Sequence, residues 1–118
     1  MKRDDSVYLR HILDAIAKVD AYLQDVDEVA FLQSSLVQDA VIRQIEIIGE
    51  AARHLSRELR EAHADIPWQD VAGMRDKLIH DYFGVDLDKV WLTAQDDLPM
   101  LAEVVRVILG ESQDSTGP

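Results

Sequence analysis

The residues best suited to chemistry lie in one short stretch, Arg75 to Tyr82, which reads Arg-Asp-Lys-Leu-Ile-His-Asp-Tyr. Cleavage of RNA without a metal needs a base that removes the proton of a ribose 2′-hydroxyl, and the imidazole of His80 titrates near neutrality. It also needs a fixed cation beside the phosphate, and the guanidinium of Arg75 is planar and always charged. The phenol of Tyr82 can position the phosphate through a hydrogen bond. These residue types are therefore suited to phosphodiester cleavage without a metal.

The spacing of these residues limits how one chain can use them. On a straight helix Arg75 and His80 point about 140° away from each other, whereas Arg75 and Tyr82 share a face. Asp76 precedes His80 by four positions, shares its face, and can orient the imidazole. We therefore expect either an irregular helix start at Arg75 or, preferably, a two-fold axis that brings two copies of the segment into one cleft. A structural interpretation, in which these side chains only pack and form ion pairs, stays open.

The sequence offers no convincing metal site beside this segment. The four histidines, at positions 11, 54, 63 and 80, are scattered, no His-Glu-x-x-His pattern occurs, and there is no cysteine. The lack of cysteine excludes a thiolate zinc site, a disulfide framework and a cysteine nucleophile. We therefore predict an active site that uses no metal and no cofactor.

Helices are expected to position these side chains, because apolar residues recur at helical spacing along nearly the whole chain. A first helix is predicted over residues 5–24, and a connector with one turn of helix over 25–31. A central helix is expected to begin at an N-cap, for which Ser34 and Ser35 are both suited, and to end near Leu55 or Leu59. Its apolar stripe follows a 4-4-3-4-3 spacing and should be the most buried part of the chain: Val37, Val41, Ile45, Ile48, Ala52 and Leu55.

Proline, glycine and aspartate divide the second half of the chain into shorter predicted helices. Pro67 fits the first position of a short helix, and another helix is expected over 74–83 with Gly84 as its stop. Asp86 is predicted to cap the next helix. A further helix is expected to start within residues 96–99, with Pro99 in its first turn.

A polar ridge on the predicted central helix lies opposite the apolar stripe. Arg43, Glu46, Glu50 and Arg53 follow a 3-4-3 spacing. Glu46 and Glu50 are like charges four positions apart, which repel each other unless a cation from Arg75 or a partner chain lies between them. Arg43, Glu46 and Glu50 are therefore candidate walls of the cleft, and a solvated face with ordinary ion pairs is the alternative.

Composition bounds the class of protein. The 118 residues carry 12 Lys and Arg against 23 Asp and Glu, a net charge of −11, and 47% are hydrophobic. Such an acidic chain is not expected to hold nucleic acid by bulk charge. Residues 41–80 nevertheless carry six basic and seven acidic side chains, against six and sixteen in the rest, so the charge pattern allows a locally neutral or positive cleft; acidic faces that only keep the protein soluble are the alternative.

These observations predict one all-α domain, a bundle of four to six helices over residues 1–110, with a disordered tail at 111–118. No apolar stretch approaches the roughly 20 residues of a membrane span, and no signal-peptide pattern follows Met1. We therefore expect a cytoplasmic protein that does not contact a membrane.

The motif Arg-x4-His-x-Tyr, present as Arg75, His80 and Tyr82, resembles the signature of the HEPN superfamily. More narrowly, it resembles HepT, the toxin of HepT–MntA toxin–antitoxin pairs. The likeness covers almost the whole chain, because further segments resemble that family in order and spacing: the run 47–52, the Ile66-Pro67-Trp68 break, the Met74-Arg75-Asp76 entry, and Val90-Trp91 followed by Leu98-Pro99.

The resemblance implies a dimeric, metal-independent endoribonuclease toxin of a type VII-like pair, which cleaves RNA by 2′-hydroxyl attack in a cleft between two protomers. It implies catalytic roles for Arg75 and His80. It also implies that an MNT-type nucleotidyltransferase antitoxin, which itself uses ATP and Mg²⁺, neutralises the toxin by adenylylating Tyr82. The expected partners are RNA, the antitoxin and a second copy of the chain, and a larger assembly with the antitoxin stays open. The alternative is a non-catalytic helical dimer that docks the nucleotidyltransferase and is modified by it.

Overall fold

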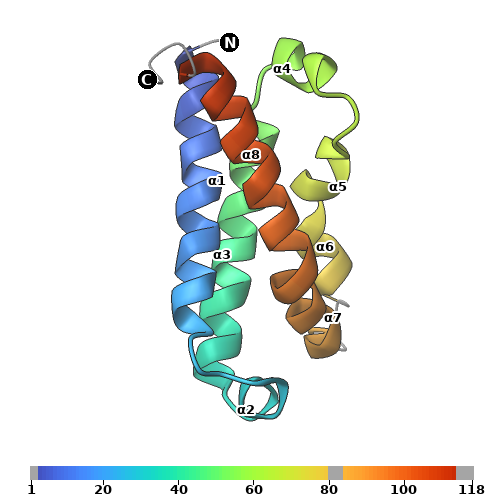
Figure 1. Ribbon diagram of the computed structural model, residues 1–118. Coiled ribbons are helices and arrows are strands. Elements are labelled where there is room, and N and C mark those ends of the chain that lie inside the picture. The colour runs from blue at the N-terminus through green and yellow to red at the C-terminus, as the bar shows by residue number, and fades with distance from the viewer. Residues whose placement is uncertain (1–2, 80–83, 114–118) are drawn as a thin grey trace.

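Three long helices dominate the computed structural model, in which residues 3–79 and 84–113 are described. Helices α1 (Arg3–Tyr22) and α3 (Ser35–Arg53) lie antiparallel, and α8 (Leu98–Gln113) crosses them (Figure 1). The core forms where these helices meet, and its largest fully buried side chains include Leu9, Ile12, Phe31, Ile45, Ile48 and Leu98. The predicted all-α fold is confirmed.

The connector between α1 and α3 holds the expected turn of helix, α2 (Glu28–Leu32). The Asp27 carboxylate caps it by accepting a hydrogen bond from the Ala30 N–H at 2.8 Å. Phe31 is fully buried and packs against the ring of Trp91, with centroids 5.4 Å apart. The connector is therefore anchored to the core by one aromatic side chain.

Helix α3 is the central helix that the apolar stripe predicts. Ser34 caps it, because its Oγ accepts a hydrogen bond from the Val37 N–H at 3.2 Å. The remaining members of the stripe are all buried, with exposed fractions of 0–2%: Val41, Ile45, Ile48, Ala52 and Leu55. The 4-4-3-4-3 spacing therefore identified the buried face correctly.

The end of α3 agrees with the shorter of the two predicted ends. The helix stops at Arg53, and Ser56 caps a separate helix, α4 (Arg57–Ala62), by accepting from the Leu59 N–H at 3.1 Å. The buried carboxylate of Asp5 fixes this corner, since it accepts hydrogen bonds from the Ser56 N–H at 2.7 Å and the Ser56 hydroxyl at 2.6 Å. A continuous helix to Leu59 is therefore wrong.

Helices α4, α5 (Trp68–Ala72) and α6 (Met74–Leu78) descend one side of the bundle (Figure 1). The predicted helix over 74–83 is wrong, because α6 ends at Leu78 and Ile79 has extended backbone angles (φ −109°, ψ 125°). The Leu78 carbonyl accepts from the Asp86 N–H at 2.8 Å, and Ile79 forms an isolated antiparallel bridge with Val85. Gly84 follows the helix by several residues and, with φ of +85°, adopts a backbone conformation that favours glycine.

The last part of the described chain is one helical run with a distortion in its middle. Asp86 caps α7 (Leu87–Leu92), as predicted, and its carboxylate accepts from the Lys89 N–H at 3.1 Å. The predicted start within 96–99 is confirmed, because α8 begins at Leu98 with Pro99 in its first turn, although a π-helical segment, η2 (Thr93–Asp97), joins α8 to α7 without the break that the sequence pattern predicted. Pro99 explains the distortion, because proline has no N–H for the carbonyl four residues earlier and its ring clashes with it.

Helix α8 reaches Gln113, three residues into the predicted tail, and residues 114–118 lie outside the described part. Across residues 3–79 and 84–113, no helix combines the length and the apolar character that crossing a membrane requires.

Candidate active site

The structure locates some of the predicted site residues and not others. Arg75 is the second residue of α6, and Asp76 follows it on the same short helix. His80 and Tyr82 lie outside the described residues. The predicted facing relations between positions 75, 80 and 82, and between 76 and 80, assumed a straight helix through this stretch. Because α6 ends at Leu78, these relations no longer follow from helix geometry, and they stay predictions.

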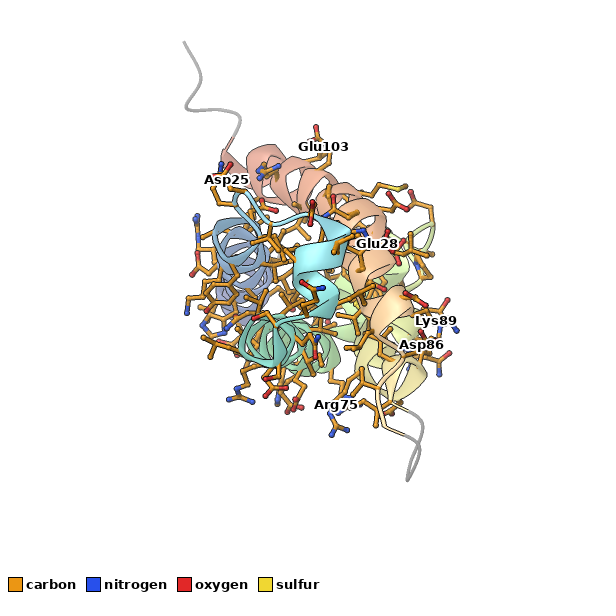
Figure 2. The ribbon with its side chains drawn as sticks, turned by 90° about the horizontal axis from the view of Figure 1, so that it is seen from below. Asp25, Glu28, Arg75, Asp86, Lys89 and Glu103 are labelled. Carbon is orange, nitrogen blue, oxygen red and sulfur yellow. The ribbon has the colours of Figure 1, made fainter. Side chains whose placement is uncertain are left out.

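Arg75 is held against the polar ridge of α3. Its Nε lies 3.4 Å from the Glu46 Oε2, and its Nη1 lies 3.8 Å from the Asp76 Oδ1. The side chain of Arg75 is 48% exposed, that of Glu46 34% and that of Asp76 70%. Figure 2 shows Arg75 projecting from the edge of the molecule. Arg75 was one of the two expected sources of a cation between Glu46 and Glu50. It lies beside Glu46 and faces solvent, whereas Glu50 contacts Arg53 and His54.

The rest of the ridge balances its charges within α3. The Glu50 Oε2 lies 3.5 Å from the Arg53 Nη1, and its Oε1 lies 3.2 Å from the His54 Nε2. Arg43 is exposed at the other end of the ridge. Glu46 and Glu50 are thus each next to a different cationic or imidazole group, which relieves the repulsion expected between two carboxylates one turn apart.

A close backbone approach between α3 and α5 brings Arg75 to Glu46. A Cβ added to Gly49 on α3 would lie 2.9 Å from the carbonyl oxygen of Ala72, at the end of α5. Trp68 anchors the start of α5, since it is buried and its Nε1 donates to the His63 carbonyl at 3.1 Å. Only glycine leaves room for α5 and α6 at this distance from α3.

The described residues on both sides of positions 80–83 are joined to each other directly after α6. The Ile79 N–H donates to the Arg75 carbonyl at 3.2 Å, and the Ile79–Val85 bridge joins the described residues on either side of positions 80–83. The segment that contains His80 and Tyr82 is therefore attached to the fold one helical turn after Arg75.

An aromatic cluster at the His54 end of the ridge was not predicted from the sequence. The rings of Tyr8 on α1 and His54 stack with centroids 4.9 Å apart and planes 15° apart. His11 meets the Tyr8 ring edge-to-face at 5.9 Å. No local pattern indicates this cluster, because Tyr8 and His54 come together only through the packing of α1 on α3.

A cavity of about 570 Å³ lies on another face of α6, between α5 and the run from α7 to α8. Met74, Lys77 and Leu78 contribute to its wall, whereas Arg75 does not. Within the described ranges, no group of three or more histidine or acidic side chains could hold a metal ion.

Comparisons with known proteins identify the family of the chain. The family described as Ribonuclease HepT-like matches residues 12–108, which is most of the chain. This chain belongs to the HepT-like ribonuclease family. No solved structure is significantly similar to it.

Three relatives of this HepT-like chain illustrate the match. It is 47% identical over 111 residues to a "Gamma-glutamylcyclotransferase and putative RNase" of Methanocaldococcus jannaschii, an alignment that covers 94% of this chain and 50% of the relative. The chain therefore spans about half the length of that relative. It is 43% identical over 101 residues to a "Probable ribonuclease HepT" of Thermococcus cleftensis, covering 86% and 92%. A "Putative RNase" of M. jannaschii is 36% identical over 107 residues, covering 91% and 98%.

Proposed function

We propose that this HepT-like chain is a metal-independent endoribonuclease toxin that acts in the cytoplasm and uses no cofactor of its own. The observation that carries the proposal is the position of Arg75. Its half-exposed guanidinium is held beside Glu46, one turn before the segment that contains His80. A fixed cation and a neighbouring imidazole are the groups that metal-free RNA cleavage requires.

In the proposed reaction His80 removes the proton from a ribose 2′-hydroxyl. The 2′-oxygen attacks the adjacent phosphorus, the bond to the 5′-oxygen of the next nucleotide breaks, that oxygen takes a proton from water and leaves as a 5′-hydroxyl, and a 2′,3′-cyclic phosphate forms. Arg75 stabilises the charge that builds on the non-bridging oxygens, because its Nη groups can form paired hydrogen bonds to a phosphate. Glu46 and Asp76 orient that guanidinium.

Two copies of the chain are proposed to form one cleft, walled by Arg43, Glu46, Glu50 and the segment from Arg75 to Tyr82. The exposed ridge on α3 supports this arrangement, because a two-fold axis near it would bring both Arg75 side chains to a shared opening.

The proposed regulator is an MNT-type nucleotidyltransferase that transfers AMP from ATP, with Mg²⁺ bound to the transferase, to the Tyr82 hydroxyl. The added AMP is bulky and anionic, so it would occupy the cleft and repel the RNA phosphate. Co-expression with such a transferase should add the mass of one or more AMP units to the wild type and none to Tyr82→Phe.

The decisive experiment measures RNA cleavage in EDTA by the wild type, Arg75→Ala and His80→Ala. Both variants should lose cleavage while their helical circular dichroism stays unchanged. The matched control is Arg106→Ala, which removes an exposed arginine paired only with Glu103 on α8 among the described residues. It should retain wild-type cleavage.

The products distinguish the mechanism from other nuclease reactions. The proposal requires 2′,3′-cyclic phosphate ends and resistance of a substrate whose scissile nucleotide is 2′-deoxy. Cleavage of the deoxy substrate, or loss of cleavage in EDTA, would refute it. Adenylylation of a wild type that never cleaves RNA would instead favour the non-catalytic docking module.

A further inference from the structure

We infer that one face of α3 is a binding track for single-stranded RNA, on which His54, supported by Tyr8, stacks against a nucleobase. This inference rests on the proposed function, because it adds a binding subsite to the same cleft. We call the face the α3 strip and define it by Arg43, Glu46, Glu50, Arg53 and His54.

The α3 strip is one continuous surface between two other helices. Its members follow one another at three- and four-residue steps, apart from the adjacent pair Arg53 and His54, and all are exposed or half-buried. Arg75 of α6 borders the strip at Glu46, and Tyr8 of α1 borders it at His54. A strand that reaches Arg75 therefore has a path along α3 towards Tyr8.

His54 has the properties of a stacking platform. Tyr8 covers one face of its imidazole, and the Glu50 carboxylate contacts its Nε2 at 3.2 Å. The side chain of His54 is still 51% exposed, and we infer that the exposed part includes the ring face opposite Tyr8, where a base can stack. Because the ring is already held on one face and at one nitrogen, little conformational entropy is lost when a base stacks on it.

Charge favours a nucleic acid on this strip over the rest of the surface. Three guanidiniums, of Arg43, Arg53 and Arg75, lie on or beside the strip and match the three carboxylates of Glu46, Glu50 and Asp76, whereas the whole chain has a net charge of −11. A nucleic acid strand presents phosphates and base faces in alternation. The strip presents guanidiniums along its length and an imidazole at its end, and a partner with anionic groups alone would not need the imidazole.

The spacing on the strip predicts which nucleotide reaches His54. Glu46, which holds Arg75, and His54 are eight residues apart, or about 12 Å along the helix axis. That distance corresponds to roughly three nucleotides of a stacked strand. The base on His54 is therefore expected about three positions from the phosphate that is cleaved.

The test uses uncleavable 2′-deoxy-substituted oligonucleotides that carry 2-aminopurine at one position at a time, because this fluorescent base is quenched when it stacks. Quenching by the wild type should be strongest about three positions from the scissile phosphate. His54→Ala should remove that quenching and raise the Kd about tenfold, as the loss of one base–aromatic stack does. His54→Phe and Tyr8→Phe retain the rings and should bind like the wild type.

Matched controls separate stacking from folding. His63→Ala removes a histidine located between α4 and α5 and should change neither quenching nor Kd. Thermal unfolding of His54→Ala shows whether the domain remains folded. If that variant unfolds, quenching and Kd can be compared between His54→Phe and His54→Ser at low temperature, because only His54→Phe retains a ring.

The outcomes separate the inference from the proposed function. If His54→Ala changes neither RNA cleavage nor the Kd, the subsite is refuted and the proposed ribonuclease activity is not affected. A wild type that does not cleave RNA but quenches the base through His54 would refute the ribonuclease while the subsite stands. Equal quenching at every position of the oligonucleotide would also refute the subsite.

Discussion

At the scale of single residues, Arg75 depends on Glu46 for its orientation. The contact between the Arg75 Nε and the Glu46 carboxylate uses one edge of the guanidinium, so the Nη groups keep donors for a phosphate. Because both side chains are a third or more exposed, this ion pair contributes little to folding stability. Its expected role is therefore in positioning.

Glu46→Gln is expected to separate these two effects. The amide retains the shape of Glu46 and loses its charge, so RNA cleavage should fall about tenfold. The Tm should change by less than about 2 °C, as for other exposed ion pairs. Glu103→Gln, which removes the exposed partner of Arg106 on α8, is the control and should cleave RNA normally. A normal cleavage rate in Glu46→Gln would contradict the positioning role.

Asp5 is expected to matter for stability alone. Its carboxylate is 1% exposed and accepts two hydrogen bonds from Ser56, which itself caps α4. Asp5→Ala leaves both donors without this acceptor, so the free energy of unfolding should fall by about 2 kcal/mol and the Tm by roughly 8 °C. Chemical and thermal denaturation measure the loss. Asp4→Ala, an exposed neighbour, should stay within about 0.5 kcal/mol of the wild type, and an equal loss in both variants would argue against the Asp5 bonds.

At the scale of elements, the contact between α3 and α5 sets the place of α6. Gly49→Ala would put a methyl group 2.9 Å from the Ala72 carbonyl oxygen, and a backbone atom cannot swing away as a flexible side chain can. We expect a loss of about 1–3 kcal/mol and lower cleavage, because α5 and α6 must shift away from Glu46. Gly110→Ala on α8 meets nothing within 4 Å and should gain about 0.5–1 kcal/mol from helix propensity. Denaturation of both variants measures this difference in the free energy of unfolding. Equal stabilities of the two variants would contradict the prediction.

Helical periodicity was enough to predict α1, α3 and the caps at Ser34 and Asp86, because these features are local. The end of α6 was not predictable in this way. Its last carbonyl, on Leu78, accepts from the N–H of Asp86, a residue beyond the reach of helical hydrogen bonding. The start of α8 at Leu98 was predictable from Pro99, because proline is favoured in a first helical turn, but the π-helical segment η2 that joins α8 to α7 was not.

The same distinction between local and distant contacts applies to the candidate site. The pairing of Arg75 with Glu46 was foreseeable, because two carboxylates one turn apart on one face require a cation. The Tyr8–His54 stack and the Asp5–Ser56 bonds were not, since they join positions about 50 residues apart. Such contacts depend on how α1 packs against α3, which the pattern of either helix alone does not determine.

At the scale of the whole molecule, the distribution of charge restricts where RNA can bind. The net charge of −11 repels a polyanion over most of the surface, whereas the guanidiniums of Arg43, Arg53 and Arg75 gather along one face of α3 and beside it. Binding confined to a few phosphate contacts is weak and depends only modestly on salt. A single added AMP can therefore tip the balance against RNA, which is consistent with control by modification.

The proposed dimer makes a prediction that depends on both chains at once. In the shared cleft, Arg75 of one protomer is expected to act with His80 of its partner. A dimer of one Arg75→Ala chain and one His80→Ala chain then retains one complete pair. A dimer made of either variant alone has no complete pair of Arg75 and His80.

Mixing the two inactive variants in equal amounts, with exchange of subunits, should therefore restore about a quarter of wild-type cleavage, since half of the dimers are mixed and each has one of two sites. Light scattering should give twice the 13.4 kDa mass of the chain for each variant and for the mixture. Mixed dimers with no cleavage would mean that each Arg75 acts with the His80 of its own chain. A monomeric mass would remove the shared cleft altogether.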